Sequence, residues 1–365
     1  MPTTISVLGA GLMGRLISLH LARAGHSVDL YEQGGPDGAS SAAHVAAAML
    51  APLAESVVSE PIVVKLGFAG IKRWPELLAS LPEPVFFQQN GTLILWHPQD
   101  RDQAAIFGAR LRSLDPDILR TNRVYEMRGA DIETLEPALG NRFARAFFLE
   151  GEGQLDNRGV LAALLHALEA DGVRLHWHTA MTPDRAGGDW VIDCRGLGAK
   201  PEWPALRGVR GEVLRVRAPE VEFSRPIRLL HPRYPLYIAP KPGGVYVIGA
   251  TQIESEDQSP TSVRSALELL SALYSVHPAF GEARILEMAA QCRPALPDNL
   301  PRIRWGGGRT IEVNGLYRHG FLVAPALMDA ALALLQHLMA NAGDNWEEWR
   351  ETQHWPSIYQ MKEDS

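Results

Sequence analysis

A glycine-rich turn near the N-terminus constrains this chain more than any other feature. An apolar run over residues 5–8 leads into Gly9-Ala10-Gly11-Leu12-Met13-Gly14, and a second apolar run over 28–31 ends at Glu32. Between the two runs, leucines at positions 12, 16, 19 and 21 fall on or near one face of a helix. The sequence therefore predicts a strand–turn–helix–strand unit with the G-x-G-x-x-G spacing.

Each glycine of this turn has its own physical task. Gly9 permits the tight turn, Gly11 lets backbone N–H groups approach a pyrophosphate, and Gly14 lets the helix pack close to the sheet. The helix N-terminus adds unpaired N–H groups and a partial positive charge. Glu32, about 20 residues beyond the glycines, is placed to accept hydrogen bonds from ribose hydroxyls. An ordinary turn can carry glycines, but the full unit predicts a dinucleotide site for either NAD or FAD.

Composition narrows the class of protein. A chain of 365 residues is long enough for two domains, and its net charge of −7 argues against a general nucleic-acid-binding surface. No uninterrupted apolar segment reaches the length of a membrane span, and the first strand begins too early to leave room for a signal peptide. The two cysteines, Cys194 and Cys292, lie far apart, which argues against a disulfide framework or a cysteine metal site. We therefore expect a cytoplasmic protein without a metal centre, and a homo-oligomer stays open.

Hydrophobic periodicity gives the remaining elements. It predicts helices over 61–81, 101–114, 261–275 and 326–339, and strands over 92–96, 146–149, 173–178, 190–199, 211–217, 235–239, 244–250 and 285–291. Asp156 or Asn157 is expected to cap a further helix that Gly172 ends, so that residues 146–178 form a second βαβ-like passage. Nucleotide-binding pieces thus lie at the N-terminus, the middle and the C-terminus, with strand-rich pieces between them.

Four blocks of sequence together resemble the D-amino-acid oxidase family of FAD enzymes. The first is the glycine turn with Glu32, and the second runs from Ser40-Ser41-Ala42-Ala43 to Met49-Leu50-Ala51-Pro52. The third is residues 191–196, and the fourth, the most specific, is G-L-Y-R-H-G-F-L-V-A-P at 315–325. The blocks occur in the family's order over most of residues 5–340. Within the family, the sequence is most similar to the glycine oxidase branch of thiamine biosynthesis.

The resemblance implies an α/β fold of the D-amino-acid oxidase type. A Rossmann-like FAD-binding domain would comprise residues 1–84, 141–208 and 302–343. An interleaved substrate-binding domain with an antiparallel sheet would comprise residues 85–140 and 209–301. Residues 344–365, which hold three tryptophans among charged residues, would form a C-terminal tail.

The resemblance also implies FAD, held without a covalent bond, and a set of residues around it. Gly9, Gly11 and Gly14 would cradle the pyrophosphate, and Glu32 would bind the adenosine ribose. The other expected contacts with the cofactor are Ser40, Ser41, Met49, Met181, Gly196, His319, Gly320, Phe321 and Leu322. Two departures stand out: alanines fill positions 46–48, where the family often has glycine, and His44 lies near the place where some relatives attach flavin to a histidine. A packed or solvated histidine is the more ordinary interpretation of His44.

Oxidation of an amino acid requires that its Cα–H be held over the flavin. An arginine fork grips the substrate carboxylate best, through charge-assisted hydrogen bonds. By resemblance, Arg318 matches the carboxylate-binding arginine, Arg293 a second arginine near the substrate, and Tyr237 the active-site tyrosine, with Tyr234 as a substitute. Each has an ordinary alternative as a solvated arginine, an arginine paired with an acid, or a core aromatic side chain.

The resemblance implies oxidative deamination of glycine, sarcosine or a small D-amino acid by hydride transfer from Cα to flavin N5. Orientation, rather than acid–base catalysis, would be the main catalytic device. O2 would take up the electrons and give H2O2; the alternative is a dehydrogenase that passes them to a quinone or another carrier. An NAD-dependent enzyme and a non-catalytic flavin-binding protein are further alternatives. No feature of the sequence selects the substrate or the acceptor.

Overall fold

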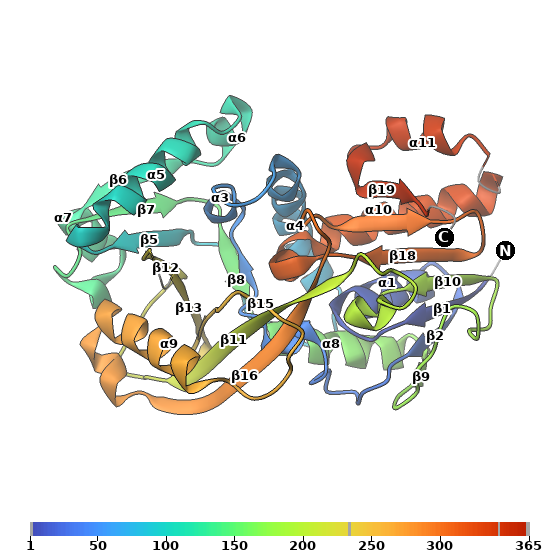
Figure 1. Cartoon of the computed structure of the whole chain (residues 1–365), viewed down its shortest axis with the longest axis horizontal. Helices are drawn as coiled ribbons and strands as arrows, with labels where there is room; N and C mark the ends of the chain where they lie inside the picture. Colours follow the sequence, from blue (N-terminus) through green and yellow to red (C-terminus); the bar gives the residue numbers. More distant parts are fainter. Residues whose placement is uncertain (1–2, 233–234, 342–343, 363–365) are drawn as a thin grey trace.

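Two large sheets stand side by side in the computed structural model (Figure 1). It describes residues 3–232, 235–341 and 344–362, so the substitute candidate Tyr234 lies outside the described residues. The first sheet has the order β19-β17-β18-β10-β1-β2-β9. Its strands are β1 (Thr4–Leu8), β2 (Ser27–Tyr31), β9 (Arg174–His176), β10 (Trp190–Asp193), β17 (Arg302–Trp305), β18 (Thr310–Asn314) and β19 (Tyr359–Met361).

The centre of the first sheet is parallel. β1 pairs in parallel with β2 and β10, and β10 pairs in parallel with β18. Ile5, Val7 and Leu8 of β1 are fully buried, as expected for a parallel strand covered on both faces. Helices α1 (Leu12–Arg23), α8 (Asn157–Ala170), α10 (Gly320–Asn341) and α4 (Pro61–Ala79) pack in this half of the molecule. The predicted strand–turn–helix–strand unit is therefore confirmed as β1–α1–β2.

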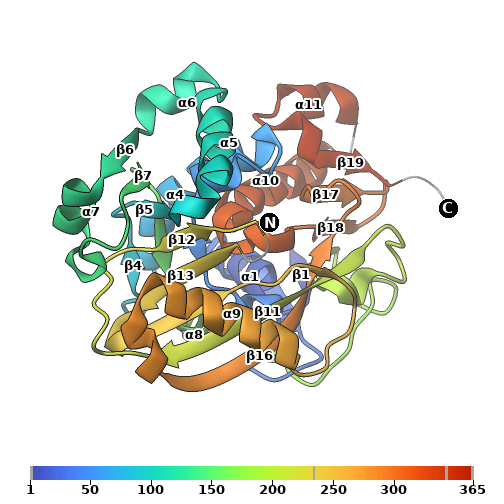
Figure 2. The same ribbon diagram turned by 60° about the vertical axis from the view of Figure 1, so that its left-hand side comes forward.

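The second sheet is mostly antiparallel, with the order β15-β11-β14-β13-β12-β5-β7-β6, and β16 pairs with β11. Its strands are β5 (Thr92–Trp96), β6 (Val124–Arg128), β7 (Arg145–Leu149), β11 (Arg207–Arg217), β12 (Ile227–Leu230), β13 (Leu236–Lys241), β14 (Val245–Gly249), β15 (Ile253–Glu254) and β16 (Arg284–Ala295). Helix α9 (Val263–Val276) covers one face, where it packs with Leu214, Ile238 and Ile248 (Figure 2). The opposite face, with Val213 and Val247, packs against Val45 and Ala47.

Shorter elements complete the fold. A small sheet joins β3 (Met49–Leu50), β8 (Gly153–Leu155) and β4 (Phe87–Gln88). The remaining α-helices are α2 (Ala42–Val45), α3 (Pro52–Glu55), α5 (Arg101–Arg112), α6 (Pro116–Thr121), α7 (Gly129–Leu135) and α11 (Trp346–Thr352). Parallel and antiparallel sheets with covering helices confirm the predicted α/β class.

The second βαβ-like passage is a wrong prediction. The helix itself is correct: α8 begins at Asn157, and the side chain of Asp156 caps it by accepting a hydrogen bond from the Arg158 N–H. However, β7 belongs to the second sheet and β8 to the small sheet, whereas β9 belongs to the first sheet. The segment therefore carries the chain from one sheet to another instead of forming a crossover within one sheet.

The start of the last long helix was also predicted wrongly. α10 begins at Gly320, six residues before the predicted start, and contains Pro325. Proline has no N–H, so the carbonyl of Phe321 loses its partner within the helix. The indole Nε1 of Trp74, on α4, donates to that carbonyl at 2.8 Å. Close packing of α4 on α10 therefore replaces the missing hydrogen bond and lets the helix run through the proline.

α10 also corrects the expectation that no segment is long and apolar enough to span a membrane. Residues 317–341 meet that criterion by length and composition, as the one such helix in the described part of the chain. Most of the helix is nevertheless buried within the protein, with Val323, Leu327 and Leu334 fully covered. Its apolar composition is therefore that of a core helix, packed against α1 and α4.

Candidate active site

A continuous cavity of about 930 Å³ is lined by residues of both large sheets. A volume of this size lies at the upper end of the range for small-molecule and cofactor sites. It brings together nearly all the predicted site residues: Gly9, Gly11, Glu32, Ser40, Ser41, Met49, Gly196, Tyr237, Arg293, Arg318, His319, Gly320, Phe321 and Leu322. Segments far apart in the sequence thus converge on one site.

The glycine turn has the geometry that a phosphate cradle requires. Gly9 has a φ of +90°, and a Cβ there would lie 2.7 Å from the Cys194 carbonyl oxygen. Gly14 lies behind the turn, outside the cavity lining, where a Cβ would lie 1.8 Å from the Gly9 carbonyl oxygen. A Cβ on Gly11 would have only the Cβ of Ser41, at 3.8 Å, within 4 Å. The first turn of α1 carries no acidic side chain that would compete with an anion.

Glu32 lies beside this turn at the end of β2. Its Oε2 accepts a hydrogen bond from the Ala10 N–H at 2.8 Å, and its Oε1 accepts one from the Gly34 N–H at 2.8 Å. The carboxylate is thus fixed at the cavity wall, at the position expected for a ribose-binding acid. The turn, the open helix N-terminus and this acid fit the adenosine diphosphate part of FAD.

A second helix N-terminus faces the same cavity. The 3₁₀ turn Tyr317–His319 leads directly into α10, and residues 316–322 line the cavity. The partial positive charge of this terminus stabilises a nearby electron-rich group. The pyrimidine end of a flavin ring is one such electron-rich group. The residues at this end of the cavity therefore also fit FAD.

Residues 43–48, which pass the cavity, are held by buried side chains from elsewhere in the chain. Asn157 Nδ2 donates to the Ala43 carbonyl at 2.9 Å, and Lys241 Nζ donates to the Ala47 carbonyl at 2.9 Å. The carbonyl and N–H of one trans peptide point in opposite directions, so the Ala48 N–H points away from Lys241. Sequence analysis missed both tethers, because a polar residue at the end of an apolar strand or helix is no specific signal.

Ala48 has a φ of +50°, in the region that favours glycine. It lies in the stretch of residues 46–48, within which the resemblance leads us to expect a glycine. We expect Ala48→Gly to raise the free energy of unfolding by about 1 kcal/mol, because the left-handed conformation strains an alanine. Urea unfolding of the two proteins measures the difference.

Ala46→Gly is the matched control, since Ala46 has an ordinary φ of −58°. There the glycine only adds freedom to the unfolded chain, and we expect a loss of about 0.5–1 kcal/mol. Equal losses in both variants would show that Ala48 is not strained.

Besides Gly14, two residues singled out in the sequence lie outside the cavity. His44 does not line it, although Ala43 and Val45 beside it do. The non-covalent attachment of the cofactor stays a prediction. Met181 packs with Leu8 and Val191 rather than at the cavity wall, so its contact with the cofactor stays a prediction.

Two glycines make room for Tyr237 and Arg293 on the second sheet. A Cβ on Gly249 would lie 2.6 Å from the Tyr237 hydroxyl oxygen, and a Cβ on Gly211 would lie 2.2 Å from Nη2 of Arg293. Arg293 Nη1 donates to the Thr251 carbonyl at 3.2 Å. A phenol and a guanidinium group are thus laid over neighbouring strands, β14 and β11.

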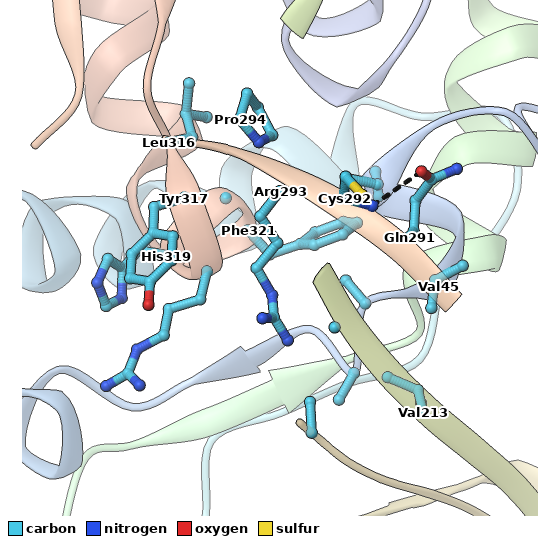
Figure 3. Close-up of a pocket in the computed structure, with 18 of the residues that line it drawn as sticks. Val45, Val213, Gln291, Cys292, Arg293, Pro294, Leu316, Tyr317, His319 and Phe321 are labelled. Carbon is cyan, nitrogen blue, oxygen red and sulfur yellow. Dashed lines mark hydrogen bonds between the residues drawn. The ribbon is translucent and has the colours of Figure 1, made fainter. Parts of the chain in front are cut away.

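Figure 3 shows Arg293 reaching from β16 into the cavity, with Tyr317 and His319 on one side and Val213 on the other. Burial lowers the pKa of Arg293 and raises the pKa of Tyr237. The tyrosine is therefore a neutral hydroxyl that can donate a hydrogen bond, beside a guanidinium group that has no carboxylate partner among the described residues.

Arg318 has a different environment, because it is paired with an acid. Its Nη2 donates to Oε2 of Glu55, and Nη1 of Arg228 donates to the other oxygen of Glu55 at 3.3 Å. Burial alone would raise the pKa of Glu55, but the two arginines lower it to about 2. One carboxylate is thus shared by two guanidinium groups. Sequence analysis named Arg318 but missed Glu55 and Arg228, which lie in apolar surroundings without a recognisable motif.

His319 is buried beside this cluster. Its Nε2 lies 3.2 Å from the Ser59 hydroxyl, and its Nδ1 lies 3.5 Å from Oε2 of Glu55. Burial lowers the pKa of His319 to about 4, although Glu55 opposes the change. The imidazole is therefore neutral near pH 7.

The backbone N–H and the backbone carbonyl of Ala54 are both bonded to buried side chains, which positions Glu55. Oε1 of Glu152 accepts a hydrogen bond from the Ala54 N–H at 2.8 Å, and Arg228 Nη1 donates to the Ala54 carbonyl at 2.8 Å. Glu152 is fully buried, and burial raises its pKa to about 8 in spite of the hydrogen bond from Ala54. At pH 7 its carboxyl group is mostly protonated.

This raised pKa predicts a pH dependence of stability. The same carboxyl titrates near pH 4.3 when unfolded, so between about pH 5 and pH 8 the folded protein binds more protons than the unfolded one. Stability therefore falls as the pH rises through this window. We expect Glu152→Gln to remove roughly 3 kcal/mol of that fall, measured by denaturant unfolding at both pH values. Glu150→Gln, at an exposed position, is the control; identical pH profiles for the wild type and Glu152→Gln would contradict the expectation.

Comparisons with known proteins agree with this site. Residues 4–332 match the DAO family model, described as FAD dependent oxidoreductase. The chain is 44% identical over 323 residues to the "Putative thiamine biosynthesis oxidoreductase ThiO" of Rhizobium etli, with 88% of this chain and 93% of the relative covered. It is 26% identical over 362 residues to the glycine oxidase of Geobacillus kaustophilus, with 88% and 89% covered.

The fold is also similar to that of a solved structure. The crystal structure of glycine oxidase from Geobacillus kaustophilus superposes with a TM-score of 0.78 at 24% identity, covering 92% of this chain and 95% of that one. The resemblance read from four sequence blocks and the expected cofactor, FAD rather than NAD, are confirmed. The chain therefore belongs to the DAO family of FAD-dependent oxidoreductases.

Proposed function

We propose that this chain oxidises a small amino acid such as glycine, sarcosine or a small D-amino acid, giving an imine that hydrolyses to an oxo acid and ammonia, or methylamine in the case of sarcosine. The names of its relatives, a thiamine biosynthesis oxidoreductase and a glycine oxidase, support this class of substrate. One structural observation carries the proposal. A guanidinium group and a phenol hydroxyl, Arg293 and Tyr237, lie over two glycines at one end of the FAD-sized cavity.

Arg293 is the side chain we assign to the substrate carboxylate. The resemblance implied Arg318 for this role, but the guanidinium of Arg318 is already paired with Glu55. Arg293 has a backbone carbonyl as its partner, and its two Nη atoms can form a charge-assisted fork with a carboxylate. Tyr237 is placed to donate a further hydrogen bond to the same anion.

In the remaining chemistry, the main contribution that we assign to the protein is the orientation of the substrate. When bound, FAD would supply the hydride acceptor, N5, and a route for the electrons to O2, the acceptor we propose, which would give H2O2. Glu55 and His319 are poor bases near pH 7, because their pKa values are about 2 and 4. Arg293 and Tyr237 would instead fix the amino acid so that its Cα–H faces the ring, and that orientation is the catalytic contribution we assign to them.

Anaerobic bleaching of the flavin against a panel of amino acids tests the proposal. Glycine, sarcosine and D-alanine should bleach the yellow protein, whereas L-alanine should not, and readmission of air should yield peroxide. Bleaching followed by slow reoxidation in air would instead favour a dehydrogenase that uses a quinone or another carrier. Failure of every amine to bleach the flavin would overturn the proposed function.

A further inference from the structure

The substrate end of the cavity carries more positive charge than one substrate carboxylate can match. Three guanidinium groups, those of Arg228, Arg293 and Arg318, line it together with one ionised carboxylate, that of Glu55. The side chains of Arg228, Arg318 and Glu55 are only 15%, 25% and 19% exposed. An unmatched charge in such a setting is unfavourable, because little water remains to solvate it.

Neighbouring titratable groups do not neutralise this excess positive charge. Glu152, behind Ala54, has a pKa raised to about 8 by burial and is mostly neutral at pH 7, and His319 is neutral as well. Arg264 and Glu268, on α9, also line the cavity, but their charges cancel. Once the substrate's α-carboxylate is bound to Arg293, one positive charge on the Arg228–Glu55–Arg318 cluster still lacks a partner.

The register of the second sheet places this cluster on the far side of Tyr237 from Arg293. Arg228 on β12 lies directly opposite Tyr237 on β13, and Tyr237 lies opposite Gly249 on β14. Directly opposed side chains share one face of a sheet, with Cβ atoms about 5 Å apart. The guanidinium of Arg293 lies over Gly211 on β11, the next strand beyond β14. Tyr237 thus stands between two cationic groups.

We propose that Arg228, Arg318 and Glu55 form a second anion subsite, and that the preferred substrate is a dicarboxylic amine: an acidic D-amino acid or an N-carboxymethyl amino acid. The proposal rests on the proposed function, since the first carboxylate is the one held by Arg293. The distal carboxylate shares the two guanidinium groups with Glu55, so that two anions and two cations balance. Glycine has only one carboxylate and would leave this subsite empty.

Pairs of substrates that differ in one charge test this in the wild-type holoenzyme. D-aspartate is compared with D-asparagine, and iminodiacetate with its monoamide, by anaerobic flavin reduction. We expect the dianion of each pair to show a KM at least about tenfold lower, the ratio that corresponds to 1.4 kcal/mol. Equal values, or a preference for the amide, would overturn the subsite while leaving amine oxidation intact.

A binding measurement separates the subsite from the reaction. Malonate and malonamate have similar shapes but differ in one charge, and both perturb the flavin spectrum if they bind beside the ring. We expect malonate to bind at least about tenfold more tightly. If no amine reduced the flavin, the proposed function would fail, and this titration would still decide whether a second anion is recognised.

Two variants should change the preference in opposite directions. Arg228→Met leaves Glu55 paired with Arg318 alone, so the dianion preference should fall at least about tenfold. Glu55→Gln leaves both guanidinium groups unmatched, so the preference should rise. Arg217→Met, at an exposed arginine on β11, is the matched control for the loss of one distant charge. A general disturbance of the fold would move both variants in the same direction, and that outcome would count against the subsite.

Discussion

Arg293→Met is expected to lower kcat/KM for glycine about a hundredfold, mainly by raising KM. A lost pair of charge-assisted hydrogen bonds costs about 3 kcal/mol, and each 1.4 kcal/mol is a factor of ten. Arg293→Lys keeps the charge but loses the planar fork, so its loss should be smaller yet still measurable. Steady-state kinetics with glycine, together with the rate of anaerobic flavin reduction, gives both values.

The comparison with Arg318→Met decides which arginine holds the carboxylate. Without Arg318, Glu55 keeps Arg228 as a partner, and the pair is neutral. Glycine oxidation should therefore suffer less than in Arg293→Met. A larger loss in Arg318→Met would return the carboxylate to Arg318, as the resemblance to the family implies, and would remove the basis for a separate second subsite.

Gly14→Ala should destabilise the protein even without its cofactor. The added Cβ would lie 1.8 Å from the Gly9 carbonyl oxygen, so α1 has to move away from the turn. Backbone shifts of this kind cost at least 1–3 kcal/mol, and we expect about 3 kcal/mol or more here. Denaturant unfolding of the apoprotein measures the loss, and FAD retention during purification should fall with it.

Gly11→Ala is the matched contrast on the same turn. Its Cβ meets nothing closer than 3.8 Å, so the apoprotein should lose less than about 1 kcal/mol. The new methyl group instead occupies space on the cavity side, where the pyrophosphate is expected, and the dissociation constant of FAD should rise. Equal apoprotein losses in the two variants would contradict this division of tasks.

Local patterns in the sequence predicted four of the seven strands of the first sheet, β1, β2, β9 and β10, and much of the cavity wall. The β1–α1–β2 unit is encoded in 28 consecutive residues, Thr4–Tyr31, whose glycines and apolar spacing act on near neighbours. The block at 315–325 likewise places its residues at one helix start. The cofactor and the family could be predicted from these blocks, because the residues that identify them lie close together within each block.

The partners that decide what each arginine can bind could not be predicted. Glu55 is separated from Arg228 by 173 positions and from Arg318 by 263. Their meeting depends on the register of the second sheet and on the placement of α3, which no local periodicity encodes. The roles of individual site residues, the domain boundaries, the cytoplasmic location and the oligomeric state stay predictions.

The start of α10 illustrates the same limit for secondary structure. Proline usually marks a helix boundary, and the pattern around Pro325 was interpreted that way. The hydrogen bond that permits the helix to continue comes from Trp74, 247 positions away from Phe321. The side chain of a residue far away in the sequence therefore lets the helix continue where the local pattern predicts a helix boundary.

The tethers of residues 43–48 also limit how substrate can enter. Lys241, from the second sheet, is bonded to the carbonyls of Ala47 and Leu155, and Arg158 of α8 is paired with Glu287 of β16 at 2.7 Å. A hinge motion that parted the two sheets would break these links and leave the buried amino group of Lys241 without hydrogen-bond acceptors. Turnover should therefore proceed with the two halves held together, so that amine and product enter and leave the cavity without a hinge motion.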